Sequence, residues 1–114
     1  ASDVYKRQRL TPDRDTIYAD GKDLSYVTVE IIDKEGNLCP WAENEVNFEI
    51  EGAGFNAGVD NGSPVSLEPF KSDSRKAFYG KAMLIILSNG DKGKIQISAK
   101  SNGLKTGNTV VTAK

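Results

Sequence analysis

The side chains best suited to chemistry in this sequence are its carboxylates, and Glu49 and Glu51 are spaced to share one face of an extended strand. Two acids flanking one bond are what glycoside hydrolysis requires. The residues between and before them, however, alternate apolar and polar, which places both glutamates on the solvated side of the strand. Nothing around them suggests the apolar pocket in which a carboxylic acid serves as a general acid. We therefore assign no catalytic residue.

Other catalytic and metal-binding arrangements are limited by the composition. The chain has no histidine, which removes Ser-His-Asp and Cys-His arrangements as well as imidazole metal ligands. Its single cysteine, Cys39, can form neither an internal disulfide nor a cysteine-based metal site, and we expect a packed, hydrophobe-like residue. Asp20, Asp23 and Asp60 could offer oxygen ligands to Ca²⁺, but their place in turns favours capping of their own backbone. We expect no metal and no cofactor.

Aromatic residues are the remaining candidates for a binding site. Trp41 follows Pro40 in a predicted inter-strand loop, and three tyrosines lie where exposure is expected: Tyr18, Tyr26 and Tyr79. Such rings stack on sugars or pack against a neighbouring protein domain, and both alternatives stay open.

Alternation with a period of two predicts the elements that position these residues. Val27, Val29 and Ile31 point one way, and the same pattern recurs in residues 46–51 and 94–100. Residues 83–87 are continuously apolar, which predicts a strand buried on both faces. Turn signals rich in Gly, Asn and Asp separate these runs. No stretch of ten residues has helical spacing, so the pattern indicates a sandwich or barrel.

Bulk properties favour one domain. The chain has 114 residues, a net charge of −1 and 38% hydrophobic residues, which suffices for one core and gives no sign of a nucleic-acid partner. The longest apolar run, residues 82–87, is too short to insert into a membrane. Residues 1–9 show no regular apolar period, and we interpret them as a linker or an appended tail. The sandwich is expected over residues 10–114.

Two segments carry a family resemblance. Residues 24–48 contain an alternating strand, a turn with Asp33, Gly36 and Asn37, and a second strand ending at Phe48. Together with residues 93–104, they resemble bacterial immunoglobulin-like domains of the invasin type. The resemblance implies an all-β, immunoglobulin-like sandwich of about seven to nine strands in two antiparallel sheets.

A wider set of motifs narrows the resemblance. It comprises residues 10–25, the sequence GVDNG at 58–62 and the sequence RKAFYGKA at 75–82. This combination is similar to the accessory immunoglobulin-like domains near the C-terminus of bacterial glycoside hydrolase family 2 enzymes, especially β-galactosidases. In that family the catalytic glutamates lie in a separate (β/α)₈ barrel, so the resemblance carries no catalytic residue onto this chain. It implies a retaining glycosidase as the parent.

The resemblance leaves the role of the domain open. It implies a non-catalytic module that supports or spaces the catalytic barrel, with adjacent domains of the parent glycosidase as partners. A carbohydrate-binding module and an adhesin-type domain of a surface protein remain alternatives. The resemblance also implies a location in the periplasm, at the cell surface or outside the cell.

Overall fold

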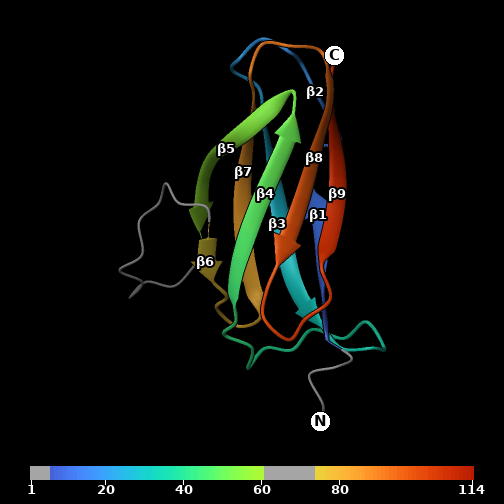
Figure 1. Ribbon diagram of the computed structural model, residues 1–114, viewed down its shortest axis with the longest axis vertical. Coiled ribbons are helices and arrows are strands. Elements are labelled where there is room, and N and C mark those ends of the chain that lie inside the picture. The colour runs from blue at the N-terminus through green and yellow to red at the C-terminus, as the bar shows by residue number, and fades with distance from the viewer. Residues whose placement is uncertain (1–5, 61–73) are drawn as a thin grey trace.

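The computed structural model describes residues 6–60 and 74–114, and within them the chain forms a β-sandwich (Figure 1). One sheet has the order β1-β3-β7-β5 and the other β2-β9-β8-β4-β6, and the described residues contain no helix. The strands are β1 (Arg7–Pro12), β2 (Thr16–Ile17), β3 (Leu24–Ile32), β4 (Glu45–Gly52), β5 (Gly54–Asp60), β6 (Ser74–Lys76), β7 (Lys81–Ser88), β8 (Gly93–Lys100) and β9 (Gly107–Ala113). The sequence-based prediction of an all-β, immunoglobulin-like sandwich is confirmed.

The core lies between the two sheets and follows the predicted alternation. Val27 and Val29 of β3 are buried, and so are Ile95 and Ile97 of β8 on the facing sheet. The inward-facing residues of the alternating pattern in each sheet therefore meet in one apolar layer. Burial of this layer, at about 25 cal/mol per Å² of apolar surface, is the main stabilisation of a domain of this size.

Pairing within the sheets is antiparallel with one exception. Thr16 and Ile17 of β2 run parallel to Thr112 and Ala113 of β9. The short strand β2 thereby crosses from β1 in one sheet to the edge of the other, and its Ile17 is fully buried. This crossover fixes the loop that carries Tyr18 and Asp20.

The interpretation of residues 1–9 as a linker or tail is wrong for residues 7–9. These residues form the start of β1, where Arg7 pairs with Ile32 and Arg9 with Glu30. Gln8 points inward and is only 4% exposed, and its amide nitrogen donates to the carbonyl oxygen of Ala99 at 2.8 Å. A polar residue at an inward position hid the strand from an apolar pattern. Residues 1–5 lie outside the described part of the chain.

The prediction that residues 83–87 are buried on both faces is also wrong in part. Leu84 and Ile86 face the core and are fully buried, whereas Met83, Ile85 and Leu87 are only partly buried on the outer face. The strand is central in its sheet, and its outer side is not covered by another layer of described residues. The sequence also predicts a turn at Asn61 and Gly62, and an irregular edge around Pro64 and Pro69 because proline cannot donate to a strand ladder. Both segments lie outside the described residues.

Candidate functional site

The structure brings two of the four aromatic candidates to the same end of the sandwich. Trp41 lies in the loop from β3 to β4 and is 67% exposed, and Tyr79 lies in the turn from β6 to β7 and is 66% exposed. The two segments are joined by a hydrogen bond of 3.2 Å from the backbone nitrogen of Gly80 to the carbonyl oxygen of Ala42. Phe78 stacks against Tyr79, with ring centroids 4.4 Å apart and tilted by 58°. We call Trp41, Phe78 and Tyr79 the aromatic end.

Tyr79 holds an uncommon backbone conformation. Its φ is +51°, and no other non-glycine residue in the described ranges has a positive φ. For a residue with a side chain this left-handed region costs about 1–2 kcal/mol. The exposed ring recovers little of that cost by burial, so the turn presents the ring to solvent at an energetic disadvantage.

The next residue, Gly80, locks the turn against the Trp41 loop. Its φ is +76°, and a Cβ atom on it would lie 2.3 Å from the carbonyl oxygen of Cys39. Its own carbonyl oxygen accepts a 2.8 Å hydrogen bond from the backbone nitrogen of Ile31. A side chain at position 80 would therefore collide with a backbone carbonyl of the Trp41 loop.

The Trp41 loop is built from a capped turn and a small second core. The carboxylate of Asp33 accepts hydrogen bonds of 2.9 Å from the backbone nitrogens of Glu35 and Asn37. Cys39 then returns to the sheet, where its backbone nitrogen donates to the carbonyl oxygen of Ile31. Its side chain is 1% exposed and packs in the cluster Ile31, Cys39, Ala42 and Ala77. The expectation of a packed, hydrophobe-like cysteine is confirmed.

Tyr18 and Tyr26 do not join the aromatic end. Tyr18 is 58% exposed and lies at the other end of β3, where the ammonium of Lys114 is 5.3 Å from its ring centroid. Tyr26 is 40% exposed on the outer face of the β1-β3-β7-β5 sheet, directly opposite Ile85. The four aromatic candidates therefore form no single platform.

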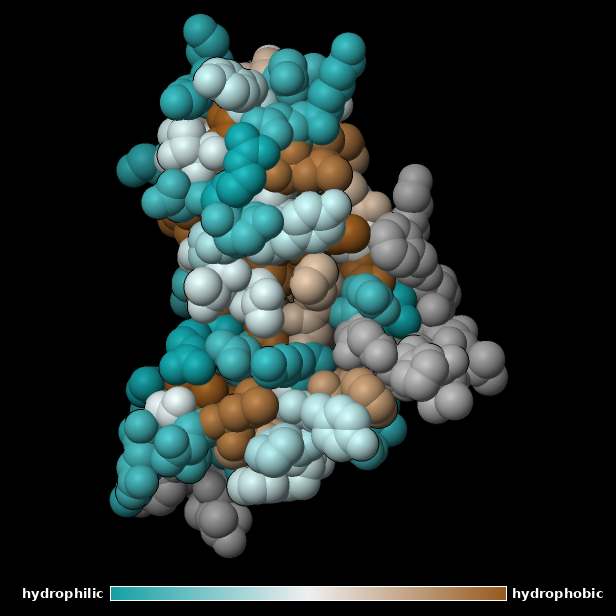
Figure 2. All heavy atoms as spheres, turned by 180° about the vertical axis from the view of Figure 1, so that it is seen from behind, coloured by the Kyte–Doolittle hydropathy of each residue, from teal (hydrophilic) through white to brown (hydrophobic). Residues whose placement is uncertain are grey.

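The outer face of that sheet carries apolar side chains (Figure 2). Ile85 and Leu87 of β7 are partly buried there, and Phe55 of β5, opposite Leu87, is 46% exposed. Sequence reasoning placed β7 in the interior and so missed this surface.

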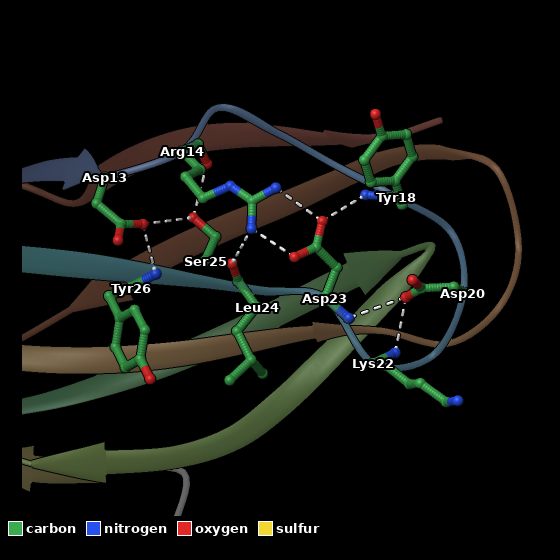
Figure 3. A network of polar contacts seen from close by, with 9 residues as sticks. All are labelled: Asp13, Arg14, Tyr18, Asp20, Lys22, Asp23, Leu24, Ser25 and Tyr26. Carbon is green, nitrogen blue, oxygen red and sulfur yellow. Dashed lines mark hydrogen bonds and ion pairs between the residues drawn. The ribbon is translucent and has the colours of Figure 1, made fainter.

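A polar network holds the loop that carries Tyr18 (Figure 3). The guanidinium of Arg14 binds both carboxylate oxygens of Asp23, one of them at 2.8 Å. The Asp23 oxygen that lies 2.8 Å from Arg14, Oδ2, also accepts a hydrogen bond from the backbone nitrogen of Tyr18 at 2.9 Å. These donors, Arg14 first, lower the pKa of Asp23 from 3.8 to about 2.

Asp13 and Asp20 cap the backbone on either side of this ion pair. The carboxylate of Asp20 accepts from the backbone nitrogens of Lys22 and Asp23, and these bonds lower its pKa. Asp13 accepts from the backbone nitrogen of Tyr26 at 2.8 Å. Each carboxylate has a structural use, in agreement with the predicted turn-capping role of Asp20. Residues 6–60 and 74–114 contain no group of three or more His, Cys, Asp or Glu side chains placed to hold a metal ion.

Glu49 and Glu51 lie on the exposed face of β4, as predicted. Glu49 forms an ion pair with Lys100 at 3.2 Å, in which both side chains are more than half exposed. Both glutamates line a groove of about 390 Å³ between β4 and β5, together with Phe55. The groove is open to solvent, so it gives neither acid the enclosed apolar setting of a general acid.

Within the described part of the chain, no helix is long and apolar enough to cross a membrane.

Comparison with known proteins assigns this architecture. Residues 9–110 match the family described as "Glycoside hydrolase family 2 C-terminal domain 5". Over 97 residues the chain is 59% identical to the β-galactosidase BoGH2A of Bacteroides ovatus, an alignment that covers 85% of this chain and 11% of that protein. The chain therefore spans about a tenth of the length of this relative.

Solved structures agree with this family assignment. A glycosyl hydrolase family 2 member from Bacteroides cellulosilyticus superposes with a TM-score of 0.94 at 39% sequence identity, and the match covers 96% of this chain and 14% of that one. The D00-D0 domain of intimin superposes with a TM-score of 0.67 at 18% identity, over 100% of this chain and 50% of that one. The second likeness shows the fold alone, and it confirms the immunoglobulin-like resemblance.

Proposed function

The chain belongs to the glycoside hydrolase family 2 C-terminal domain 5 family, and from this membership we propose that it is the non-catalytic accessory domain of a bacterial β-galactosidase-like enzyme. In this role it supports or spaces the catalytic barrel of its parent polypeptide. The hydrolysis of β-galactosides belongs to the parent and not to this domain.

The observation that carries the proposal is the 59% identity with a β-galactosidase over 85% of the chain. Identity at this level extends through surface and core alike, whereas a likeness of fold extends only to the core pattern. The geometry supports a supporting role, because the described carboxylates are exposed, ion-paired or engaged in backbone capping.

The proposal is tested with the full-length enzyme that carries this domain and with a truncated form that ends before residue 7, where β1 begins. Initial rates on an aryl β-galactoside and thermal unfolding are measured for both. We expect the full-length enzyme to hydrolyse the substrate, and the truncated form to keep its turnover per folded molecule while unfolding at a lower temperature. A full-length enzyme inactive on β-galactosides, or hydrolysis by the 114-residue chain alone, would contradict the proposal.

A carbohydrate-binding module is the second candidate, and exposure of Trp41 and Tyr79 at one end favours it. Exposed rings stack on the apolar faces of sugars. Titration of the 114-residue chain with galactose and lactose, followed by NMR, distinguishes the two functions. Shifts that saturate at millimolar sugar and vanish in a Trp41→Ala variant would establish sugar binding, and their absence would leave the supporting role. The adhesin alternative has support at the level of the fold only.

Export of the parent enzyme to the periplasm or the cell surface is part of the proposal, and its support is the family resemblance. Fractionation of the source cells, with activity and an antibody against this domain as markers, tests it. Recovery of both markers in the cytosolic fraction would exclude export.

A further inference from the structure

We propose that the aromatic end is the docking surface for the domain that precedes this one in the parent polypeptide. The proposal rests on the proposed function, because it takes the chain to be a C-terminal domain of a longer enzyme. It goes further in naming the surface, Trp41 with Phe78 and Tyr79, and the occupant.

The first argument is the cost of displaying Tyr79. A left-handed backbone conformation at a bulky residue is rare and persists where the surroundings impose it. The neighbouring hydrogen bonds do impose it here, because Gly80 is held on one side by Ala42 and on the other by Ile31. The product of that constraint is a ring that is 66% exposed. An exposed ring contributes little to the stability of the domain itself. It becomes favourable when a partner surface covers it.

The second argument is the composition and rigidity of the surface. Trp41 and Tyr79 are the two most exposed large hydrophobic residues of the described chain, and they lie in segments joined by a backbone hydrogen bond. Tryptophan and tyrosine are enriched at the buried centres of protein interfaces. Because both loops are fixed before binding, docking would cost little conformational entropy.

The third argument selects the occupant from the direction of the chain. β1 begins at this end, where Arg7 lies beside both Ile32, at the end of β3, and Lys105. A domain that precedes β1 in the parent polypeptide is therefore tethered at the same end as Trp41 and Tyr79. A short tether gives an effective concentration in the millimolar range, which makes even a small interface effective. Tyr18 lies at the far end of β3, away from the point where β1 begins.

The occupant is therefore expected to offer an apolar surface with a polar rim. Interfaces between domains of one chain bury roughly 600–1,500 Å² and are more polar than obligate interfaces. Two aromatic anchors within such an area are enough to dominate its energetics.

Hydroxyl-radical footprinting of the full-length enzyme, read by mass spectrometry, tests the proposal. Rates of oxidation at Trp41, Tyr79 and Tyr18 are each normalised to the same residue in the urea-unfolded enzyme. Tyr18 is the internal control, because its 58% exposure is close to that of the other two. We expect Trp41 and Tyr79 to be oxidised several-fold more slowly than Tyr18. Equal normalised rates at the three residues would overturn the proposal.

A sugar arm separates docking from carbohydrate binding. The footprinting is repeated with lactose at a saturating concentration. Protection of Trp41 that is present without lactose supports docking, and protection that appears only with lactose overturns it. The same preparation is assayed on an aryl β-galactoside, so that an inactive enzyme reports failure of the proposed function and not of the docking surface.

A variant completes the test. Trp41→Ala in the full-length enzyme should raise the oxidation rate of Tyr79 several-fold, whereas Tyr18→Ala should leave it unchanged. An unchanged rate at Tyr79 in the Trp41→Ala enzyme would show that the two rings do not share a partner and would overturn the proposal.

Discussion

Gly80 lies so close to Cys39 that a Cβ atom on it would be 2.3 Å from the cysteine's carbonyl oxygen. This contact joins the turn that carries Tyr79 to the loop that carries Trp41. It is the point at which the geometry of the aromatic end is most sensitive to a single atom.

Gly80→Ala should therefore lower the free energy of unfolding by about 2–5 kcal/mol, the sum of a left-handed backbone cost and an overpacking cost. Gly103→Ala is the matched control, because its φ of +78° is nearly that of Gly80 while no atom lies within 4 Å of its Cβ position. That control should lose only about 1–2 kcal/mol. Urea unfolding measures both, and equal losses would show that the contact with Cys39 relaxes freely.

The stability of Tyr79 variants should depend on how well the new residue tolerates a positive φ. Tyr79→Asn and Tyr79→Val both remove the ring and its contact with Phe78, but Asn tolerates φ near +51° and a β-branched residue does not. We expect the Asn variant to be more stable than the Val variant by about 1–2 kcal/mol in thermal or urea unfolding. The reverse order would mean that the turn leaves the left-handed region when the ring is removed.

The Arg14–Asp23 ion pair predicts that the stability of the domain falls at acidic pH. The pKa of Asp23 is about 2 in the folded chain and 3.8 as its ordinary value, so the folded state binds fewer protons between these values. Its contribution to stability is complete above about pH 4 and is lost as the pH falls toward 2. Asp23→Asn should flatten this part of the stability profile. Urea midpoints at pH 6 and pH 2.5 for both proteins measure it, and identical slopes would contradict the assignment.

Ile95→Asp should prevent folding. Ile95 is fully buried between the sheets, and an unpaired carboxylate there costs more than a domain with about 5–15 kcal/mol of stability can absorb. Gln96→Asp, one residue on and exposed, is the control and should leave the domain folded. Circular dichroism and the amide NMR spectrum distinguish the two outcomes. Native spectra for Ile95→Asp would mean that the inward face of β8 is assigned wrongly.

The double variant Glu49→Gln, Glu51→Gln should change stability by no more than about 1 kcal/mol, because the ion pair between Glu49 and Lys100 that it removes is exposed. In the full-length enzyme it should leave the rate of aryl β-galactoside hydrolysis unchanged. A large loss of rate with unchanged stability would point to a catalytic use of these carboxylates.

Much of the fold could be predicted because its inward residues alternate visibly, as Val27 and Val29 do. The pattern failed where an inward position is filled by Gln8, whose amide nitrogen donates to the carbonyl oxygens of Ala99 in β8 and of Lys105. It also failed at β7, since Ile85 and Leu87 are apolar but lie on the outer face. A continuously apolar strand is buried on both faces only when another layer covers the outer face of its sheet.

The candidate site was predictable residue by residue and not as an arrangement. Exposure of Trp41 and Tyr79 follows from their place in loops. Their proximity depends on a hydrogen bond between segments 38 residues apart, from Gly80 to Ala42. No periodicity in the sequence records such a contact.

The directions of the first and last strands determine how the domain responds to a pulling force. β1 and β9 run in the same direction, as the parallel bridge between Arg7 and Lys105 shows, and the chain enters at one end and leaves at the other (Figure 1). A pulling force applied between these points acts along the strands, so the hydrogen bonds of β1 to β3 and of β9 to β8 are sheared together and are not unzipped one by one. This strand geometry therefore resists a pull between the two ends more than a pull that separates the strands one hydrogen bond at a time.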